Sequence, residues 1–185
     1  MTKIEFIENS LIVEIGRIKD DCPYWAFLLM SVGIEFLGRI LNKRSDEDSG
    51  KSKYDFCYAI HNIKALKEYR DYTSTPHMDP NGQPFYDSPS KFLFKSASEK
   101  DFYIQLRCAF AHNLQMGRGI VLDNSCEKHL LENSVRLGVH AFYDDFKKAC
   151  EEILSLLKSE EHLSSENVSF FDVRSIGNIS LSGHF

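Results

Sequence analysis

The hydrophobic and polar positions along the chain follow the period of an α-helix over most of its length. Ile, Leu and Val residues separated by acids predict a first helix over residues 2–19. Pro23 suits the first turn of a second helix, over residues 23–42, whose large apolar residues lie almost all round. We therefore expect this second helix in the middle of a helical bundle. A third helix is predicted over residues 54–70.

The clearest amphipathic pattern belongs to the last helix, residues 140–158. At about 100° per residue, its apolar residues fall on one half and its charged residues on the other, which predicts a surface helix packed on the core. The apolar half contains Phe142, Phe146, Ala149, Cys150, Ile153, Leu154, Leu156 and Leu157, and the charged half contains Asp144, Asp145, Lys147, Lys148, Glu151, Glu152 and Lys158.

Three segments depart from the helical pattern. Residues 71–95 hold four of the five prolines and are expected to form a long irregular loop, of the kind that often serves as a lid or flap. Residues 114–139 contain short apolar segments separated by Asn-rich turns, which predicts a small antiparallel β-meander. Residues 159–185 are Ser-rich and are expected to be an extended tail. The predicted fold is mainly α: a compact bundle of about five helices in one domain, residues 1–158.

The composition narrows the classes of function. A net charge of −5 argues against a protein that coats nucleic acid by bulk charge, and no double-stranded DNA partner is expected. The five cysteines lie far apart and show no metal-ligand spacing, so neither a disulfide framework nor a metal site is predicted.

The apolar run that starts at Pro23 is interrupted by Glu35 and Arg39, well short of the roughly 20 residues of a membrane span. These two residues are four apart and are expected to pair with each other. The N-terminal residues lack a signal-peptide core. Together these features predict a cytoplasmic protein with no membrane partner.

The candidate chemistry lies in the fourth helix, which the capping-box pattern at Ser96–Glu99 is expected to open. With Phe102 set at zero degrees, Leu106, Ala109, Phe110 and Asn113 form the core stripe. Arg107 falls near 140° and His112 near 280°, at about 100° per residue. Between these two lie the apolar or small residues Ile104, Cys108 and Ala111, which we interpret as a second packing surface and the interface of a two-fold homodimer.

An arginine followed by four residues and a histidine, preceded here by Leu106 and followed by Asn113, resembles the Arg-x(4–6)-His signature of the HEPN superfamily. The resemblance implies a compact helical bundle that dimerises through this region. Many members are metal-independent endoribonucleases, and others have lost catalysis and bind RNA, nucleotides or proteins. Active members usually carry a polar residue after the arginine, where this chain has Cys108, so the non-catalytic binding module is the alternative.

The resemblance also implies roles for individual residues. Arg107 would hold the phosphate and His112 would transfer the proton, with no metal or cofactor. Asn113 would donate to a phosphate oxygen, and Tyr103 would either stack on a base or fill the interface. Two structural alternatives remain open. Arg107 would pair with Glu99, Asp101 or Glu35, and His112 would bond the carbonyl groups of the last helical turn.

Overall fold

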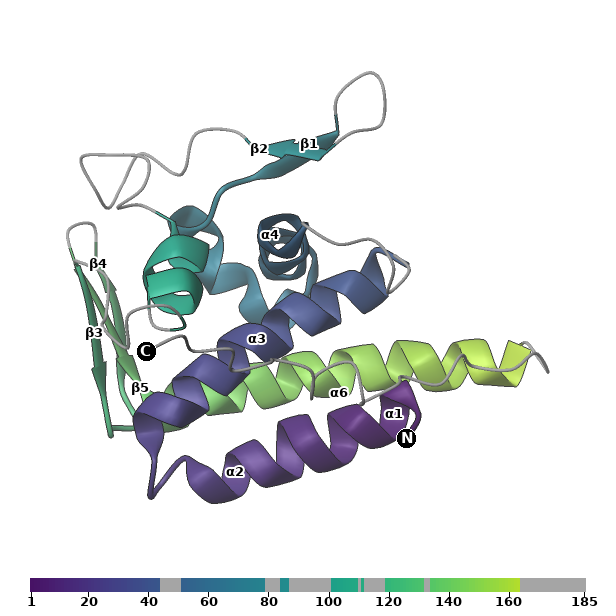
Figure 1. The fold of residues 1–185 in the computed structure, drawn as a ribbon, viewed down its shortest axis with the longest axis horizontal. Coiled ribbons are helices and arrows are strands. Elements are labelled where there is room, and N and C mark those ends of the chain that lie inside the picture. Colours follow the sequence, from purple (N-terminus) through teal and green to yellow (C-terminus); the bar gives the residue numbers. More distant parts are fainter. Residues whose placement is uncertain are drawn as a thin grey trace, which may run out of the picture.

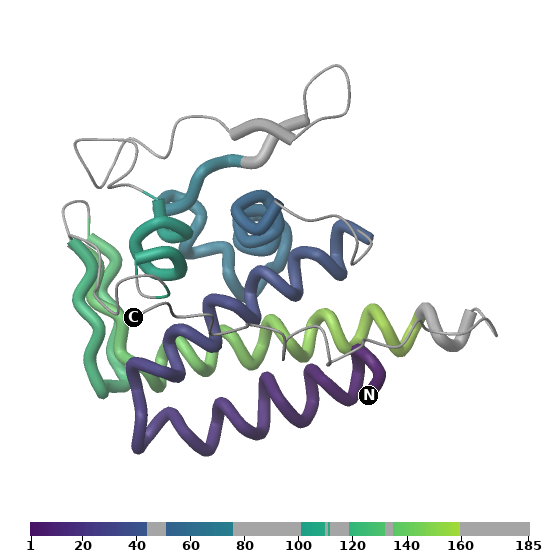
Figure 2. The backbone as a smooth tube through the Cα atoms, viewed as in Figure 1, coloured from purple at the N-terminus to yellow at the C-terminus, as the bar shows by residue number. Residues whose placement is uncertain are grey.

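The computed structural model describes residues 1–43, 51–78, 84–86, 101–109, 111, 119–131 and 134–163. Most of them are helical, so the prediction of a mainly α fold is confirmed. The first helix, α3 (Pro23–Leu41) and α6 (Val139–Leu163) lie side by side, with a small sheet at one end (Figures 1 and 2). The shorter helices, including α4 (Ser52–Asn62), cover the other side of α3.

The first helix, predicted over 2–19, consists of α1 (Lys3–Glu5), the π-helical η1 (Phe6–Glu14) and α2 (Ile15–Ile18). A capping box starts it: Glu5 N donates to Thr2 Oγ1 at 3.1 Å, and Thr2 N donates to Glu5 Oε2 at 2.7 Å. The Tyr143 hydroxyl of α6 donates to the Ile12 carbonyl oxygen at 2.8 Å. A side chain that bonds a helix carbonyl in this way disturbs the regular ladder of backbone hydrogen bonds.

Helix α3 buries one side and exposes the other. Its buried side includes Phe27, Met30 and Ile34, as expected of a central helix. However, Trp25 is 52% exposed, and the prediction that α3 is covered all round is wrong. Among the described helices α3 alone is long and apolar enough to cross a membrane, a test that the core helix of a soluble protein also passes. The exposed side borders an apolar groove of about 400 Å³, lined by Phe6, Ser10, Leu11, Glu14, Ile15, Leu29, Val32, Gly33 and Phe36.

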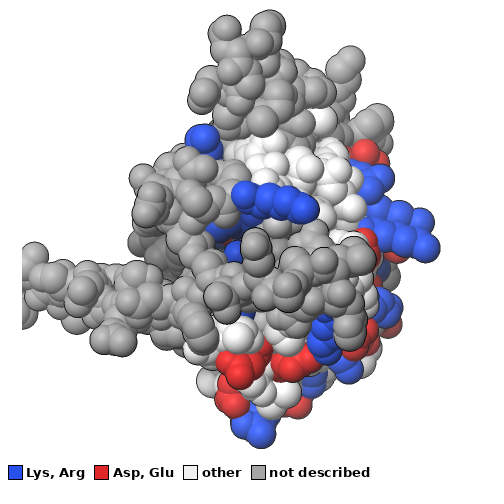
Figure 3. Space-filling view, turned by 90° about the vertical axis from the view of Figure 1, so that its right-hand side faces the viewer, with Lys and Arg blue, Asp and Glu red and all other residues white. Residues whose placement is uncertain are grey.

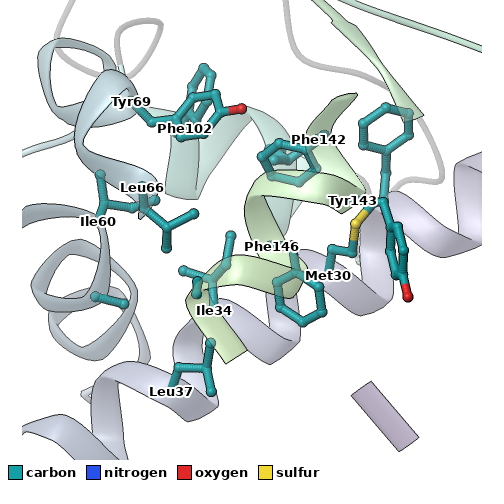
Figure 4. Close-up of a cluster of buried hydrophobic side chains, with 14 of the residues drawn as sticks. Met30, Ile34, Leu37, Ile60, Leu66, Tyr69, Phe102, Phe142, Tyr143 and Phe146 are labelled. Carbon is teal, nitrogen blue, oxygen red and sulfur yellow. The ribbon is translucent and has the colours of Figure 1, made fainter. Parts of the chain in front are cut away.

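Aromatic rings fill the core between α3, α6 and the shorter helices (Figure 4). Phe27 of α3 stacks on Phe142 of α6 with ring centroids 5.6 Å apart, and Tyr69 meets Phe142 edge-on at 5.4 Å. Two glycines bring neighbouring helices close to α3. A Cβ atom at Gly33 would lie 2.6 Å from the Phe146 ring, and one at Gly38 would lie 1.9 Å from the Asp55 carbonyl oxygen.

The segment predicted as one helix over 54–70 is two elements. Ile63 adopts an extended conformation, with φ −83° and ψ 124°, and separates α4 from the 3₁₀ helix η2 (Lys64–Tyr72). The following segment was expected to be irregular throughout, yet β1 (Pro76–Met78) and β2 (Pro84–Tyr86) pair antiparallel within it. The prediction of an irregular loop over 71–95 is therefore wrong for these six residues and for residues 71–72, which belong to η2.

A small sheet precedes α6, as predicted, but it is mixed, so the predicted antiparallel meander order is wrong. Strand β5 (Ser134–Gly138) lies in the middle, parallel to β3 (Ile120–Asp123) and antiparallel to β4 (Lys128–Leu131). Burial explains the order, because Val135 and Leu137 of β5 are fully buried, while Leu131 of β4 is 58% exposed. The most deeply buried strand takes the centre although it comes last in the chain.

Helix α6 confirms the one-sided pattern with two exceptions. Leu156, assigned to the apolar half, is 47% exposed. Asp145, assigned to the charged half, is turned inward, where it accepts a hydrogen bond from the Tyr69 hydroxyl at 2.7 Å and one from Lys128. The helix continues through Leu163, so residues 159–163 are helical rather than part of an extended tail. The rest of the predicted tail lies outside the described residues.

Candidate functional site

The helix that carries Arg107 begins at Phe102, after a buried carboxylate. Asp101 Oδ1 accepts a hydrogen bond from Tyr103 N at 2.9 Å, and Oδ2 accepts one from Ser74 Oγ at 2.6 Å. Lys53 Nζ lies 2.6 Å from Oδ2 and balances the charge. Asp101 therefore caps the helix that begins at Phe102, and the expected capping box at residues 96–99 lies outside the described part of the chain.

Residues Tyr103–Cys108 form the π-helical segment η3, and this changes the predicted directions of the side chains. In a π turn the hydrogen bonds join residues five apart, so a residue turns less about the axis than in an α-helix. Arg107, five residues after Phe102, consequently lies against α3 instead of on the outer face predicted from α-helical spacing. Phe102 and Leu106 are buried as predicted, whereas Ala109 is only half-buried.

Arg107 is held by an acid from α3. Its Nε donates to Glu35 Oε2 at 3.0 Å, and the two side chains are 22% and 17% exposed. This confirms one of the structural alternatives for Arg107. The predicted pair of Glu35 with Arg39 is wrong, because Glu35 is turned to Arg107 and Arg39 lies 3.7 Å from Asp55.

Among the described residues, Arg107 forms hydrogen bonds through Nε alone, and its two terminal nitrogens, Nη1 and Nη2, have no partner there. The Tyr103 ring lies beside the group, 5.7 Å from Cζ to the ring centroid. A guanidinium oriented through Nε keeps its two terminal donors for a second, bidentate partner.

Tyr103 is a packing residue in this structure. Its ring meets Phe56 of α4 edge-on at 5.6 Å, and its hydroxyl hydrogen-bonds the Cys108 thiol. Burial, followed by this hydrogen bond, raises the pKa of Tyr103 to about 12. These contacts fix the ring against the bundle rather than leave it extended toward a base.

The predicted interface residues are not part of the buried core. Ile104 and Cys108 are half-buried and Ala111 is exposed. His112 and Asn113, the other candidate site residues, lie outside the described residues. In the described part of the chain no group of three His, Cys, Asp or Glu side chains is arranged to hold a metal ion.

Charge on the visible surface is mixed. In the face shown in Figure 3, Lys and Arg are interspersed with Asp and Glu over the described surface. Any nucleic-acid contact on this face therefore depends on a few placed cations and not on a continuous basic surface.

Sequence reasoning paired Glu35 with Arg39 and gave its pair with Arg107 only as an alternative, although one signal favoured the latter. Glu35 is the only acid in the apolar run of α3, and a charged residue at such a position generally has a partner from another element. No protein-family model matches this chain, and neither characterised proteins nor solved structures give a match. The likeness to HEPN proteins therefore rests on the short motif around Arg107.

Proposed function

We propose that this protein is a HEPN-like endoribonuclease that works without a metal through Arg107 and His112. The observation that supports the proposal is the state of Arg107. Its guanidinium is fixed at Nε by Glu35 Oε2, 3.0 Å away, and within the described part of the chain nothing occupies its two terminal donors, which would bind a phosphate. The helix itself is anchored by buried Asp101, so the arginine is held in place before substrate binds.

The reaction in this proposal is transfer within the RNA. A histidine takes the proton of the 2′-hydroxyl, whose oxygen attacks the phosphorus, and the bond to the 5′-oxygen breaks as that oxygen receives a proton. Arg107 stabilises the negative charge that gathers on the phosphate oxygens. The products are a 2′,3′-cyclic phosphate and a 5′-hydroxyl. Asn113 would donate to a phosphate oxygen, and Tyr103 would support Arg107.

The base and the acid require two proton-transferring groups, and a homodimer would supply two copies of His112. The interface in this proposal is the outer face of Ile104, Cys108 and Ala111. Ala111 is exposed, so Ala111→Glu is expected to leave the fold intact and to yield monomers by light scattering. A wild-type protein that is already monomeric at tens of micromolar would contradict the two-fold site.

The test of the activity is RNA cleavage by purified protein in EDTA. His112→Ala and Arg107→Ala are expected to abolish cleavage, and Arg107→Lys is expected to lose most of it because a single ammonium cannot replace a planar fork. Arg17→Ala is the matched control, since the Arg17 side chain is 70% exposed and pairs with Glu14 on the surface. If EDTA abolishes cleavage, or His112→Ala retains it, the proposal is wrong.

A second candidate, a non-catalytic RNA- or nucleotide-binding module, is favoured by Cys108 and Glu35. The Cys108 thiol is engaged with Tyr103, and the Glu35 carboxylate already balances the charge of Arg107. This module would bind RNA without cleaving it, and would lose binding on Arg107→Ala. Binding without cleavage in the wild type would therefore select the second candidate.

A further inference from the structure

The apolar groove between the first helix and α3 has a volume of about 400 Å³. At one end of it, the rings of Phe6 and Phe36 meet edge-on with their centroids 5.0 Å apart. Leu29 and Val32 line the α3 side, and each is 41% exposed, so the described part of the chain leaves the groove open. Open apolar surface that is gathered in one place generally marks a binding site.

Helix α6 ends beside the Phe6 end of this groove. Lys158 Nζ of α6 donates to Glu8 Oε1 of η1 at 2.8 Å, and Glu8 lies two residues after Phe6 in the chain. Figure 1 shows the end of α6 next to α1. Residues 164–185 follow α6 and lie outside the described residues. The segment after α6 therefore starts close to the groove.

This segment is long enough to reach the groove and lie along it. Leu163 is about 8 Å beyond Lys158 along α6, at about 1.5 Å per residue. The chain from Leu163 to Phe171 can span up to about 28 Å when extended. The groove follows the first helix from Phe6 to Ile15, a length of about 14 Å at a helical rise. Phe171 can therefore return past the end of α6 and enter the groove.

The composition of the segment suits an apolar surface. Eight of the 22 residues in 164–185 are Val, Ile, Leu or Phe, whereas chain segments that remain in solvent generally contain few such residues. In an extended chain, Phe171 and Val173 would share one side, and Asp172 and Arg174 would share the other. One side of the segment thus matches the groove and the other matches water.

We propose that residues 168–176 of the same chain bind in this groove, with Phe171 and Val173 packed against Leu29 and Val32. The charged side chains of the segment remain in solvent. An attached segment competes well with any separate partner, because a short tether gives it an effective concentration of about millimolar. The groove is then an intramolecular docking site, and the bound segment covers the apolar surface of the first helix and α3.

Limited digestion of the full chain with trypsin tests this proposal. Arg174 is the only Lys or Arg after Lys158, so trypsin can cut the segment at one position. The free peptide of residues 164–185 gives the cleavage rate of an undocked segment. Because a protease must bind the segment in its own active site, docking is expected to slow cleavage at Arg174 at least about tenfold relative to the peptide.

Matched variants connect this protection to the groove. Val32→Glu places a charge in the groove, and Phe171→Ser removes the ring that binds there, so each is expected to lose most of the protection relative to its own peptide. Val121→Glu is the control, since Val121 of β3 is 48% exposed and does not line the groove, and it should be cut like the wild type. Phe171→Ser changes no residue of the described bundle, so its result does not depend on whether Val32→Glu folds.

The methyl NMR signals of Val32 provide a second measurement in the uncut protein. Phe171→Ser is expected to shift these signals, because an aromatic ring shifts the signals of the groups packed against it, and to leave those of Val121 unchanged. Val32 signals that do not move would contradict the proposal.

The proposal is also overturned if the wild type is cut at Arg174 as fast as the free peptide, or if Val121→Glu loses as much protection as Val32→Glu. Protection that rises with protein concentration would place the segment in the groove of a second copy and contradict intramolecular docking. None of these outcomes depends on RNA cleavage, so the docking site and the proposed ribonuclease can fail independently.

Discussion

The ion pair between Arg107 and Glu35 offers the sharpest test of how the candidate site is built. The perturbation is a double-mutant cycle of Glu35→Gln, Arg107→Gln and the double variant. Each single change removes one charge and leaves the other residue half-buried without its partner, and the double change removes both charges. The coupling energy of the cycle isolates the interaction between the two side chains.

The structure sets the expected size of the coupling. At 3.0 Å and an effective dielectric constant near 20, the Coulomb attraction alone is about 5 kcal/mol. The cost of removing two charges from water cancels most of this attraction. The side chains are 22% and 17% exposed, so the pair lies between surface pairs, with about 0.2–1 kcal/mol, and fully buried pairs. We expect a coupling of about 1–3 kcal/mol.

The assay is urea unfolding of the four proteins at low salt and at about 1 M salt. A control cycle uses the surface pair of Arg17 and Glu14, which is shorter, at 2.7 Å, but 70% and 59% exposed. The control coupling should be about 0.5 kcal/mol or less at low salt and should vanish at high salt. The Arg107–Glu35 coupling should mostly persist. If it is no larger than the control, burial does not strengthen this pair and our reasoning is refuted.

Three further predictions concern packing and ionisation. Gly38→Ala should lower the free energy of unfolding by about 2 kcal/mol or more, because its Cβ would clash with the Asp55 carbonyl oxygen. A stabilised variant would contradict the close approach of α4 to α3. In urea unfolding, Phe146→Ala should lower the free energy of unfolding by roughly 3–5 kcal/mol, and Lys147→Ala by under about 0.5 kcal/mol. Equal losses would show that the orientation of α6 is wrong. Absorbance titration should find a tyrosine with a pKa of about 12 that is lost in Tyr103→Phe. Tyrosine in the unfolded chain ionises near pH 10, so the stability that neutral Tyr103 contributes is complete below pH 10 and is lost as the pH rises toward 12. Between pH 10 and 12 the free energy of unfolding should therefore fall less in Tyr103→Phe than in the wild type.

The helices could be predicted because their period is a local property. In α6, the side chains of Phe142, Phe146 and Ile153 repeat on one face over several turns, and the same face is buried in the structure. Pro23 predicted the start of α3 for an equally local reason. The N–H groups of the first helical turn have no partner within the helix, so a proline, which lacks an N–H, loses nothing there. The neighbour that Gly38 admits, Asp55 of α4, is by contrast a matter of the three-dimensional packing.

The strand order could not be predicted in the same way, because it depends on which strand is buried most. Turn residues indicate where a strand ends, but they do not indicate whether the next strand along the chain is also the next in the sheet. The exposed side of α3 has a similar explanation. Apolar residues such as Trp25 and Leu29 do not themselves show whether another element covers them.

The candidate site was located by its residue types, and its geometry depends on features that a helical wheel omits. The wheel assumed α-helical spacing, but the π turns of η3 rotate Arg107 toward α3. There it meets Glu35, an acid that would be costly to bury without a cation from another element. The Glu35 carboxylate and the Arg107 guanidinium therefore hold each other in position. Tyr103, beside Arg107, packs on Phe56 of α4, and α4 in turn contacts α3 at Gly38. The contacts that build the core therefore also determine the direction of the Arg107 guanidinium.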